Sequence, residues 1–129
     1  MAIVRIDFSQ HQSEQFGQSV SEVVHRTMQT VLGVPPSENF IVCQRYPEGS
    51  ILHAPDECPP ERLDRIVFIQ ITLNLGRSAE LKNQFFAELN TSLVATVHLD
   101  PQNIYINLVE VARENWSFGY RLQPAQLID

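Results

Sequence analysis

The fold is decided by two strand-like segments, Ile3-Val4-Arg5-Ile6-Asp7-Phe8 and Phe68-Ile69-Gln70-Ile71-Thr72-Leu73, which lie 65 residues apart. In each of them successive side chains point to alternate faces, a pattern typical of a β-strand. The same offset separates two serines that precede helical patterns and two prolines that precede strands: Ser13 and Ser78, Pro36 and Pro101. The sequence therefore predicts that one strand-helix-strand unit occurs twice, because internal repeats fix architecture.

The remaining elements follow from hydrophobic periodicity. A helical pattern runs from about Ser13 to Leu32 and stops at Gly33, and a second one begins after Ser78. Strand patterns cover residues 39–46, 65–75 and 103–111. Right-handed crossovers then predict an α+β fold of two layers, in which the tandem β-α-β repeat gives a four-stranded sheet with two helices on one face.

The repeat also predicts the organisation of the chain. We expect a single domain over residues 1–129, with repeat halves at about 1–46 and 66–111. Residues 47–64 read as a long irregular loop, and residues 112–129 read as an irregular tail. Loops of this length in compact domains are often functional.

The composition limits the partners. Hydrophobic residues make up 43% and charged residues 19%, which is typical of a globular protein. A net charge of −6 with nine Lys and Arg argues against nucleic acid and anionic membranes as partners. There is no apolar run of the roughly 18 residues that a membrane span needs, and no signal peptide is visible. Because Cys43 and Cys58 form neither a metal motif nor a disulfide framework, we expect a reduced, cytoplasmic protein.

One face of the predicted sheet has no helix to cover it. Ile3, Phe68 and Tyr105 lie on this face and are too apolar for a surface that contacts only water. Large exposed apolar patches usually bind a partner. We therefore expect a homo-oligomer that buries this face.

Four pieces of the chain resemble the tautomerase superfamily: the strand that starts at residue 2, Leu32-Gly33-Val34-Pro35, Ile71-Thr72-Leu73-Asn74-Leu75-Gly76-Arg77-Ser78, and Asn107-Leu108-Val109-Glu110 followed by Asn115-Trp116-Ser117-Phe118-Gly119. The last piece is similar to the long-chain branch that includes malonate semialdehyde decarboxylase. The resemblance covers residues 1 to about 121. It implies a trimer of βαβ-βαβ subunits with active sites near the subunit interfaces, and a small carboxylate as ligand.

The family carries its catalytic amine on a proline directly after the initiator methionine, whereas this chain has Ala2. Removal of Met1 would leave a primary α-amine on Ala2, whose ordinary pKa of roughly 7.7–8.0 suits a base or an imine-forming nucleophile. If Met1 stays in place, the nitrogen of Ala2 is blocked, and Met1 would plug the pocket.

Other site residues follow from the resemblance. Arg77 matches an arginine that holds the substrate carboxylate, and its guanidinium fork suits that task; the alternative is a solvated arginine at the start of a helix. The decarboxylase branch has a second arginine where this chain has Leu75 or Asn74, and we place Leu75 in the substrate pocket. Four residues remain possible replacements for this second arginine: Arg5, Arg45, Arg113 and Arg121.

Glu38 falls where the decarboxylase has an acidic residue that orients or activates water, and is otherwise a solvated turn residue. Trp116 and Phe118 match aromatic pocket walls, although a single tryptophan also suits a core or an interface. Tyr105 can donate a hydrogen bond to substrate or pack in an interface. The catalytic candidates are thus Ala2, Glu38 and Arg77.

The sequence indicates neither a metal nor a cofactor. The four histidines do not have the spacing of metal ligands: His11, His25, His53 and His98. The few glycines, among them Gly33 and Gly76, do not form a phosphate-binding loop. The expected function is proton transfer or decarboxylation on a small oxo-carboxylate. The alternative is a binding or structural trimer that keeps the fold without the chemistry.

Overall fold

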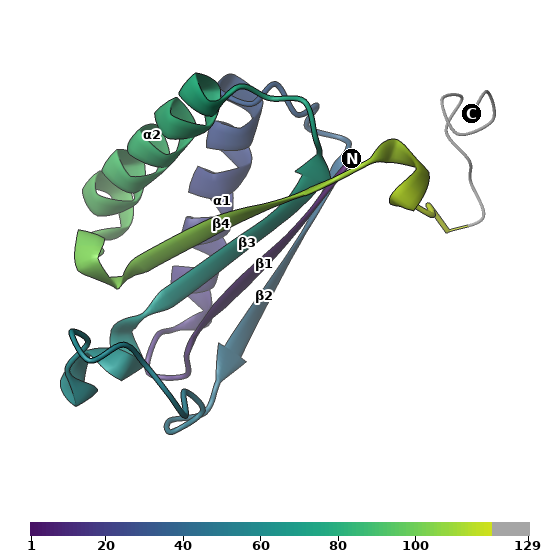
Figure 1. Cartoon of the computed structure of the whole chain (residues 1–129). Helices are drawn as coiled ribbons and strands as arrows, with labels where there is room; N and C mark the ends of the chain where they lie inside the picture. Colours follow the sequence, from purple (N-terminus) through teal and green to yellow (C-terminus); the bar gives the residue numbers. More distant parts are fainter. Residues whose placement is uncertain (120–129) are drawn as a thin grey trace.

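The computed structural model describes residues 1–119 and contains two copies of a strand-helix-strand unit (Figure 1). The first copy comprises β1 (Ala2–Ser9), α1 (Glu14–Thr30) and β2 (Asn39–Tyr46), and the second comprises β3 (Val67–Asn74), α2 (Ala79–Val97) and β4 (Ile104–Val111). Each element of the second copy begins 65 residues after its counterpart. The tandem repeat expected from the sequence is therefore confirmed.

The four strands form one mixed sheet in the order β2-β1-β3-β4. Strands β1 and β2 are parallel, as are β3 and β4, whereas β1 and β3 are antiparallel. In this register Ala2 lies opposite both Asn39 and Leu73, and Asn74 lies opposite Val111. The beginnings of β1 and β2 consequently meet the ends of β3 and β4 at one end of the sheet, which we call the N-terminal end.

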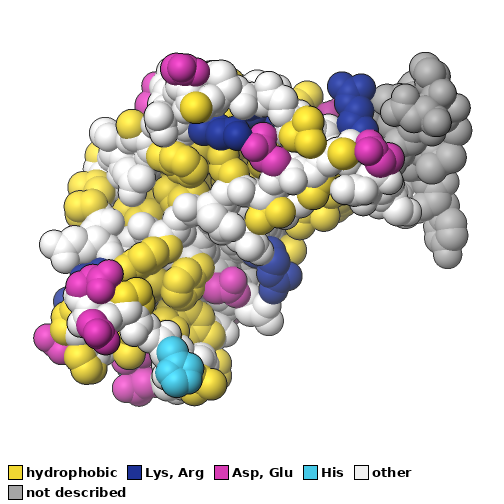
Figure 2. Space-filling view, in the orientation of Figure 1, with side chains coloured by type: hydrophobic (Ala, Val, Ile, Leu, Met, Phe, Trp, Pro, Cys, Tyr) yellow, Lys and Arg dark blue, Asp and Glu magenta, His cyan; other side chains and the backbone are white. Residues whose placement is uncertain are grey.

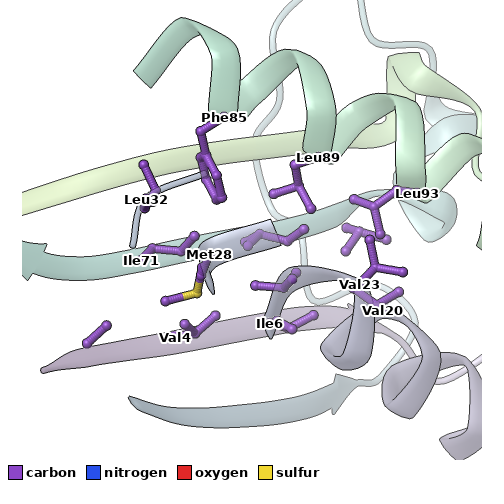
Figure 3. Packing of buried hydrophobic residues seen from close by; sticks show 14 of the residues in the cluster. Val4, Ile6, Val20, Val23, Met28, Leu32, Ile71, Phe85, Leu89 and Leu93 are labelled. Carbon is purple, nitrogen blue, oxygen red and sulfur yellow. The ribbon is translucent and has the colours of Figure 1, made fainter. Parts of the chain in front are cut away.

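Both helices cover the same face of the sheet, as Figure 1 shows. Their apolar sides contact the inward side chains of β1 and β3, including Val4 and Ile71, and together they form the core (Figure 3). Ser13 and Ser78 cap the two helices, because their hydroxyls accept hydrogen bonds from the backbone N–H groups of Phe16 and Leu81 at 3.1 and 3.2 Å. The expected caps and the two-layer fold are confirmed.

The segment between the two copies is more regular than expected. Residues 60–64, the end of the expected irregular loop, form the short 3₁₀ helix η1 (Pro60–Arg65) together with Arg65, which was expected to begin a strand. The helix starts at a proline, whose fixed φ favours a first helical position. The hydroxyl of Tyr46 donates a hydrogen bond to the carbonyl of Ile66 at 3.0 Å, which ties η1 to the sheet. Burial of this hydroxyl, with the nearby charges of Asp64 and Asp7, raises the pKa of Tyr46 to about 12.

Two further 3₁₀ turns flank β4. One is η2 (Pro101–Asn103), and the other is η3 (Arg113–Asn115), which lies in the tail that was expected to be irregular. None of the helices in the described part of the chain is long and apolar enough to span a membrane.

The second face of the sheet carries no helix and is apolar. Figure 2 shows hydrophobic side chains reaching the surface along the strands. The large exposed side chains of this open face are Ile3, Phe40, Val42, Phe68 and Tyr105, with exposed fractions of 37% to 66%. The rings of Phe68 and Tyr105 contact each other, with centroids 5.8 Å apart. The exposed apolar face predicted from the sequence is therefore present in the chain.

Candidate functional site

The candidate site is built around the start of β1, at the N-terminal end of the sheet. Ala2 is fully buried, and its backbone nitrogen donates a hydrogen bond to the carbonyl of Glu38 at 2.9 Å. The α-amine of Met1 lies 3.6 Å from the carboxylate oxygen Oε2 of Glu38. Glu38 therefore contacts the chain terminus twice, through its backbone and through its side chain.

The turn before β2 sets the position of Glu38. The backbone N–H of Val34 donates a hydrogen bond to the carbonyl of Met28 in the last turn of α1. The backbone N–H of Glu38 donates one to the carbonyl of Pro35 at 3.0 Å. Two consecutive prolines stop the helix from continuing. This short turn brings Glu38 to the start of β2, directly beside β1.

A buried amide lies next to the terminus. Asn39 is opposite Ala2 in the β1–β2 register, and its side-chain nitrogen Nδ2 is buried with no hydrogen-bond partner among the described residues. Buried polar groups are nearly always paired, so an unpaired one needs an explanation. A ligand that accepts a hydrogen bond at this position would provide the missing partner. Sequence reasoning missed Asn39, and only the pairing with β1 identifies it.

Arg77 binds the end of α1 rather than standing free in solvent. Its Nε and Nη2 both donate to the carbonyl of Leu32, at 3.1 and 3.0 Å, and its Nη1 donates to the carbonyl of Asn74 at 3.2 Å. A guanidinium has five N–H donors. One N–H on each terminal nitrogen therefore remains for a carboxylate ligand. Arg77 is thus half-buried and hydrogen-bonded, and it is not the solvated arginine of the alternative interpretation.

A second cation lies close to Arg77. Lys82 at the start of α2 binds the carboxylate of Glu110 at the end of β4. The hydrogen bond from Lys82, together with the N–H of Gly76 and the charge of Arg77, lowers the pKa of Glu110 below its usual range. Lys82 thus forms an ion pair with a carboxylate of the chain itself, and Arg77 acts on the same carboxylate only through its charge. Sequence reasoning, which considered only arginines as the second cation, missed this lysine.

The aromatic residues of the tail stack beside the same end of β3. The rings of Trp116 and Phe118 lie parallel, with centroids 5.6 Å apart, and Trp116 Nε1 donates a hydrogen bond to the side-chain oxygen of Asn74 at 2.6 Å. Leu75 is the first residue after β3. Its surface is 59% exposed, and its backbone N–H donates a hydrogen bond to the carbonyl of Val111. Asn74 therefore connects the aromatic pair to Arg77, because its own carbonyl accepts from that guanidinium.

Not every expected residue lies at this end. Tyr105 is in register with Phe68 and Asp7, roughly 17 Å from Ala2 along the strand direction, so one chain alone does not bring it to the site. Arg5 bonds to Gln44 in the middle of the open face.

The other proposed replacements for the second arginine differ in position. Arg45 bonds to the carbonyl of Gln10, at the far end of the sheet. Arg113 lies in η3, where its carbonyl accepts a hydrogen bond from the backbone of Trp116, so of the three candidates within residues 1–119 it is the one beside the aromatic pair. Arg121 lies outside the described residues.

Comparisons with known proteins give a consistent picture. The sequence model of the family described as tautomerase enzyme matches residues 48–119. The probable tautomerase YusQ of Bacillus subtilis (strain 168) is 26% identical over 119 residues, which span 92% of this chain and 94% of that protein. The solved structure of FG41 malonate semialdehyde decarboxylase inhibited by 3-bromopropiolate is similar with a TM-score of 0.77 and 25% identity, over 92% of this chain and 89% of that one. A fused 4-OT symmetric trimer is similar in fold, with a TM-score of 0.77 and 14% identity, over 97% of this chain and 98% of that one.

Proposed function

Since this chain belongs to the tautomerase family, we propose that it acts on a small oxo-carboxylate by proton transfer or decarboxylation at the N-terminal end of its sheet. The observation that carries the proposal is the double contact between Glu38 and the chain terminus, at 2.9 Å through its carbonyl and 3.6 Å through its carboxylate. The amine of this pair is that of Met1 in the structure, and removal of Met1 would leave the nitrogen of Ala2, which contacts the Glu38 carbonyl, as the amine that pairs with the Glu38 carboxylate in acid-base chemistry.

The proton-transfer group depends on the state of Met1. When Met1 is removed, the nitrogen of Ala2 becomes a primary amine that keeps the Glu38 carbonyl as its hydrogen-bond acceptor. An α-amine with a pKa of roughly 7.7–8.0 is partly neutral near pH 7 and can take a proton from the carbon beside a carbonyl. When Met1 is retained, the carboxylate of Glu38 is the base that remains at the site.

Arg77 and Asn39 would hold the substrate. The two free N–H groups of Arg77 suit a carboxylate, and the unpaired amide of Asn39 suits a carbonyl oxygen. Trp116 and Phe118 would form an apolar wall that limits water around the reacting carbon. Proton transfer in such a pocket needs no further group.

Decarboxylation would use the same residues. The bond between the carboxylate carbon and the next carbon breaks, carbon dioxide leaves, and the electron pair moves toward the neighbouring carbonyl. A cationic amine beside that carbonyl stabilises the charge that develops on it. The likeness to a malonate semialdehyde decarboxylase at 25% identity supports this version of the reaction.

We also propose that the chain assembles into a homotrimer through the open face. The exposed side chains of Ile3, Phe40 and Phe68 would be buried, and Tyr105 would reach a site only in such an assembly. The similarity of fold to a fused 4-OT symmetric trimer supports a trimer over other closed assemblies.

A second candidate function is a binding or structural trimer without catalysis. Two observations favour it: with Met1 present the nitrogen of Ala2 is a peptide nitrogen, and three donors of Arg77 bind the chain's own carbonyls. The two functions differ in whether Glu38 matters for a reaction or only for contact with the terminus.

Ketonisation of phenylenolpyruvate, followed by ultraviolet absorbance, separates these functions. We expect the native chain to accelerate the reaction over buffer, Glu38→Gln to lose most of that acceleration, and Ala2→Pro to exceed the native rate. Glu22→Gln, an exposed carboxylate on α1, is the matched control and should leave the rate unchanged. A silent native chain with an active Ala2→Pro variant would instead support the binding function.

A further inference from the structure

A cluster of potential metal ligands lies outside the site described above. The imidazole Nε2 of His11 is 3.6 Å from Oε2 of Glu48 and 3.9 Å from Oδ2 of Asp64. All three ligand atoms lie within 4.8 Å of one another. The residues come from the turn after β1, the turn after β2 and the helix η1, so the fold alone brings them together.

Hydrogen bonds fix the backbone that carries the imidazole. The N–H of His11 bonds to the hydroxyl of Ser9 at 3.2 Å. The neighbouring Gln10 bonds through its N–H to the carbonyl of Tyr46 at 2.8 Å and accepts from Arg45 at 2.7 Å. The turn after β1 is therefore held against the end of β2.

The two carboxylates also stand on fixed segments. Glu48 lies in a turn closed by Ser50, whose hydroxyl donates to the carbonyl of Pro47 at 2.6 Å. Asp64 lies in η1, between two residues, Leu63 and Ile66, whose carbonyls accept hydrogen bonds from the hydroxyl of Tyr46. A cavity of about 210 Å³ borders both carboxylates and leaves room for water.

We propose that His11, Glu48 and Asp64 form a binding site for a first-row divalent cation such as Zn²⁺, with one imidazole nitrogen and two carboxylate oxygens as ligands. A point equidistant from the three atoms lies within about 2.5 Å of each, a few tenths of an ångström beyond zinc–nitrogen and zinc–oxygen bonds of roughly 2.0–2.2 Å. Small side-chain rotations close that difference. Two carboxylates beside one imidazole also leave a net negative charge that attracts a cation.

The mixed ligand set selects the class of ion. Imidazole nitrogen suits zinc and its neighbours, whereas Ca²⁺ and Mg²⁺ prefer ligand sets made of oxygen alone. The side chains of His11 and Glu48 are 54% and 65% exposed, so an ion can enter directly from solvent and water can complete its coordination. The bound ion would connect the segment between the two repeats to the turn that precedes α1.

Isothermal titration calorimetry of the chelator-treated full chain with Zn²⁺ tests the proposal. The titration uses a Cys43→Ser background, because the exposed Cys43 thiol is a competing zinc ligand. We expect one Zn²⁺ per chain and an affinity that falls at least about tenfold in His11→Ala and in Asp64→Asn. Asp64→Asn is nearly isosteric and serves where His11→Ala disturbs the turn.

The controls decide between a site and a simple ion pair. His25→Ala, a histidine on α1, should leave Zn²⁺ binding unchanged. Ca²⁺ should bind much more weakly than Zn²⁺. The proposal is overturned if the parent chain takes up no Zn²⁺, if both ligand variants bind it as tightly as the parent, or if Ca²⁺ binds equally well, since the imidazole would then not be a ligand.

Discussion

Replacement of Arg77 by methionine should destabilise the fold as well as the site. The substitution keeps most of the side-chain stem but removes three hydrogen bonds, of which two end on the Leu32 carbonyl and one on the Asn74 carbonyl. A hydrogen bond that involves a charged group contributes roughly 1.5–3 kcal/mol. Because two donors share one acceptor and the side chain is only half-buried, we expect a total loss of about 2–3 kcal/mol.

Urea unfolding at one fixed protein concentration measures this loss, since the proposed homotrimer would make the stability depend on protein concentration. Arg77→Lys keeps one cationic donor and should recover about half of the lost stability. Arg26→Met, at an exposed arginine on α1, is the matched control and should cost less than about 0.5 kcal/mol. Equal losses of stability in Arg77→Met and Arg26→Met would refute the claim that the hydrogen bonds of Arg77 to Leu32 stabilise the end of α1.

Three further outcomes follow from the structure. Gly17→Ala should lower the free energy of unfolding in urea by about 1 kcal/mol, because the new Cβ would lie 2.7 Å from Cζ of the buried Phe8 ring. This overlap outweighs the gain in helix propensity. In a Phe8→Leu background the same substitution should be neutral or stabilising. Asn39→Leu should raise stability by about 1 kcal/mol through loss of a buried unpaired amide, yet slow ketonisation of phenylenolpyruvate, and a loss of both would show that the amide has a partner. Folding favours the protonated phenol of Tyr46, whose pKa of about 12 lies above the ordinary value of 10.0; its stabilising contribution is therefore complete below pH 10 and is lost as the pH rises toward 12. Tyr46→Phe should remove the highest tyrosinate step from an ultraviolet pH titration.

The regular elements could be predicted because their signals are local. Strand alternation in β1 and β3 and the serine caps at Ser13 and Ser78 depend on residues within a few positions of one another. The helix η1 was missed because long-range contacts stabilise it. Among them is the bond from Arg62 Nε to the side chain of Asn103 at 3.1 Å.

The candidate site was predictable only in part. The resemblance selected Glu38, which contacts the chain terminus. It also selected Trp116, which donates a hydrogen bond to the side chain of Asn74, and the carbonyl of Asn74 accepts one from Arg77. The carbonyls that Arg77 binds and the unpaired amide of Asn39 depend on which strands and turns become neighbours. Sequence spacing carries no information on such contacts, and for the same reason the histidine that meets two carboxylates could not be recognised from its spacing.

Covalent labelling with 3-bromopropiolate, read by mass spectrometry of proteolytic peptides, tests most directly the claim that a carboxylate site surrounds the chain terminus. The FG41 malonate semialdehyde decarboxylase is inhibited by this small acid. We predict an N-terminal peptide that begins at Ala2 and carries one adduct, with labelling strongly reduced in Arg77→Met. A lack of any adduct on the peptides that contain the chain terminus and Glu38, or labelling that occurs mainly at the exposed Cys43, would contradict the account.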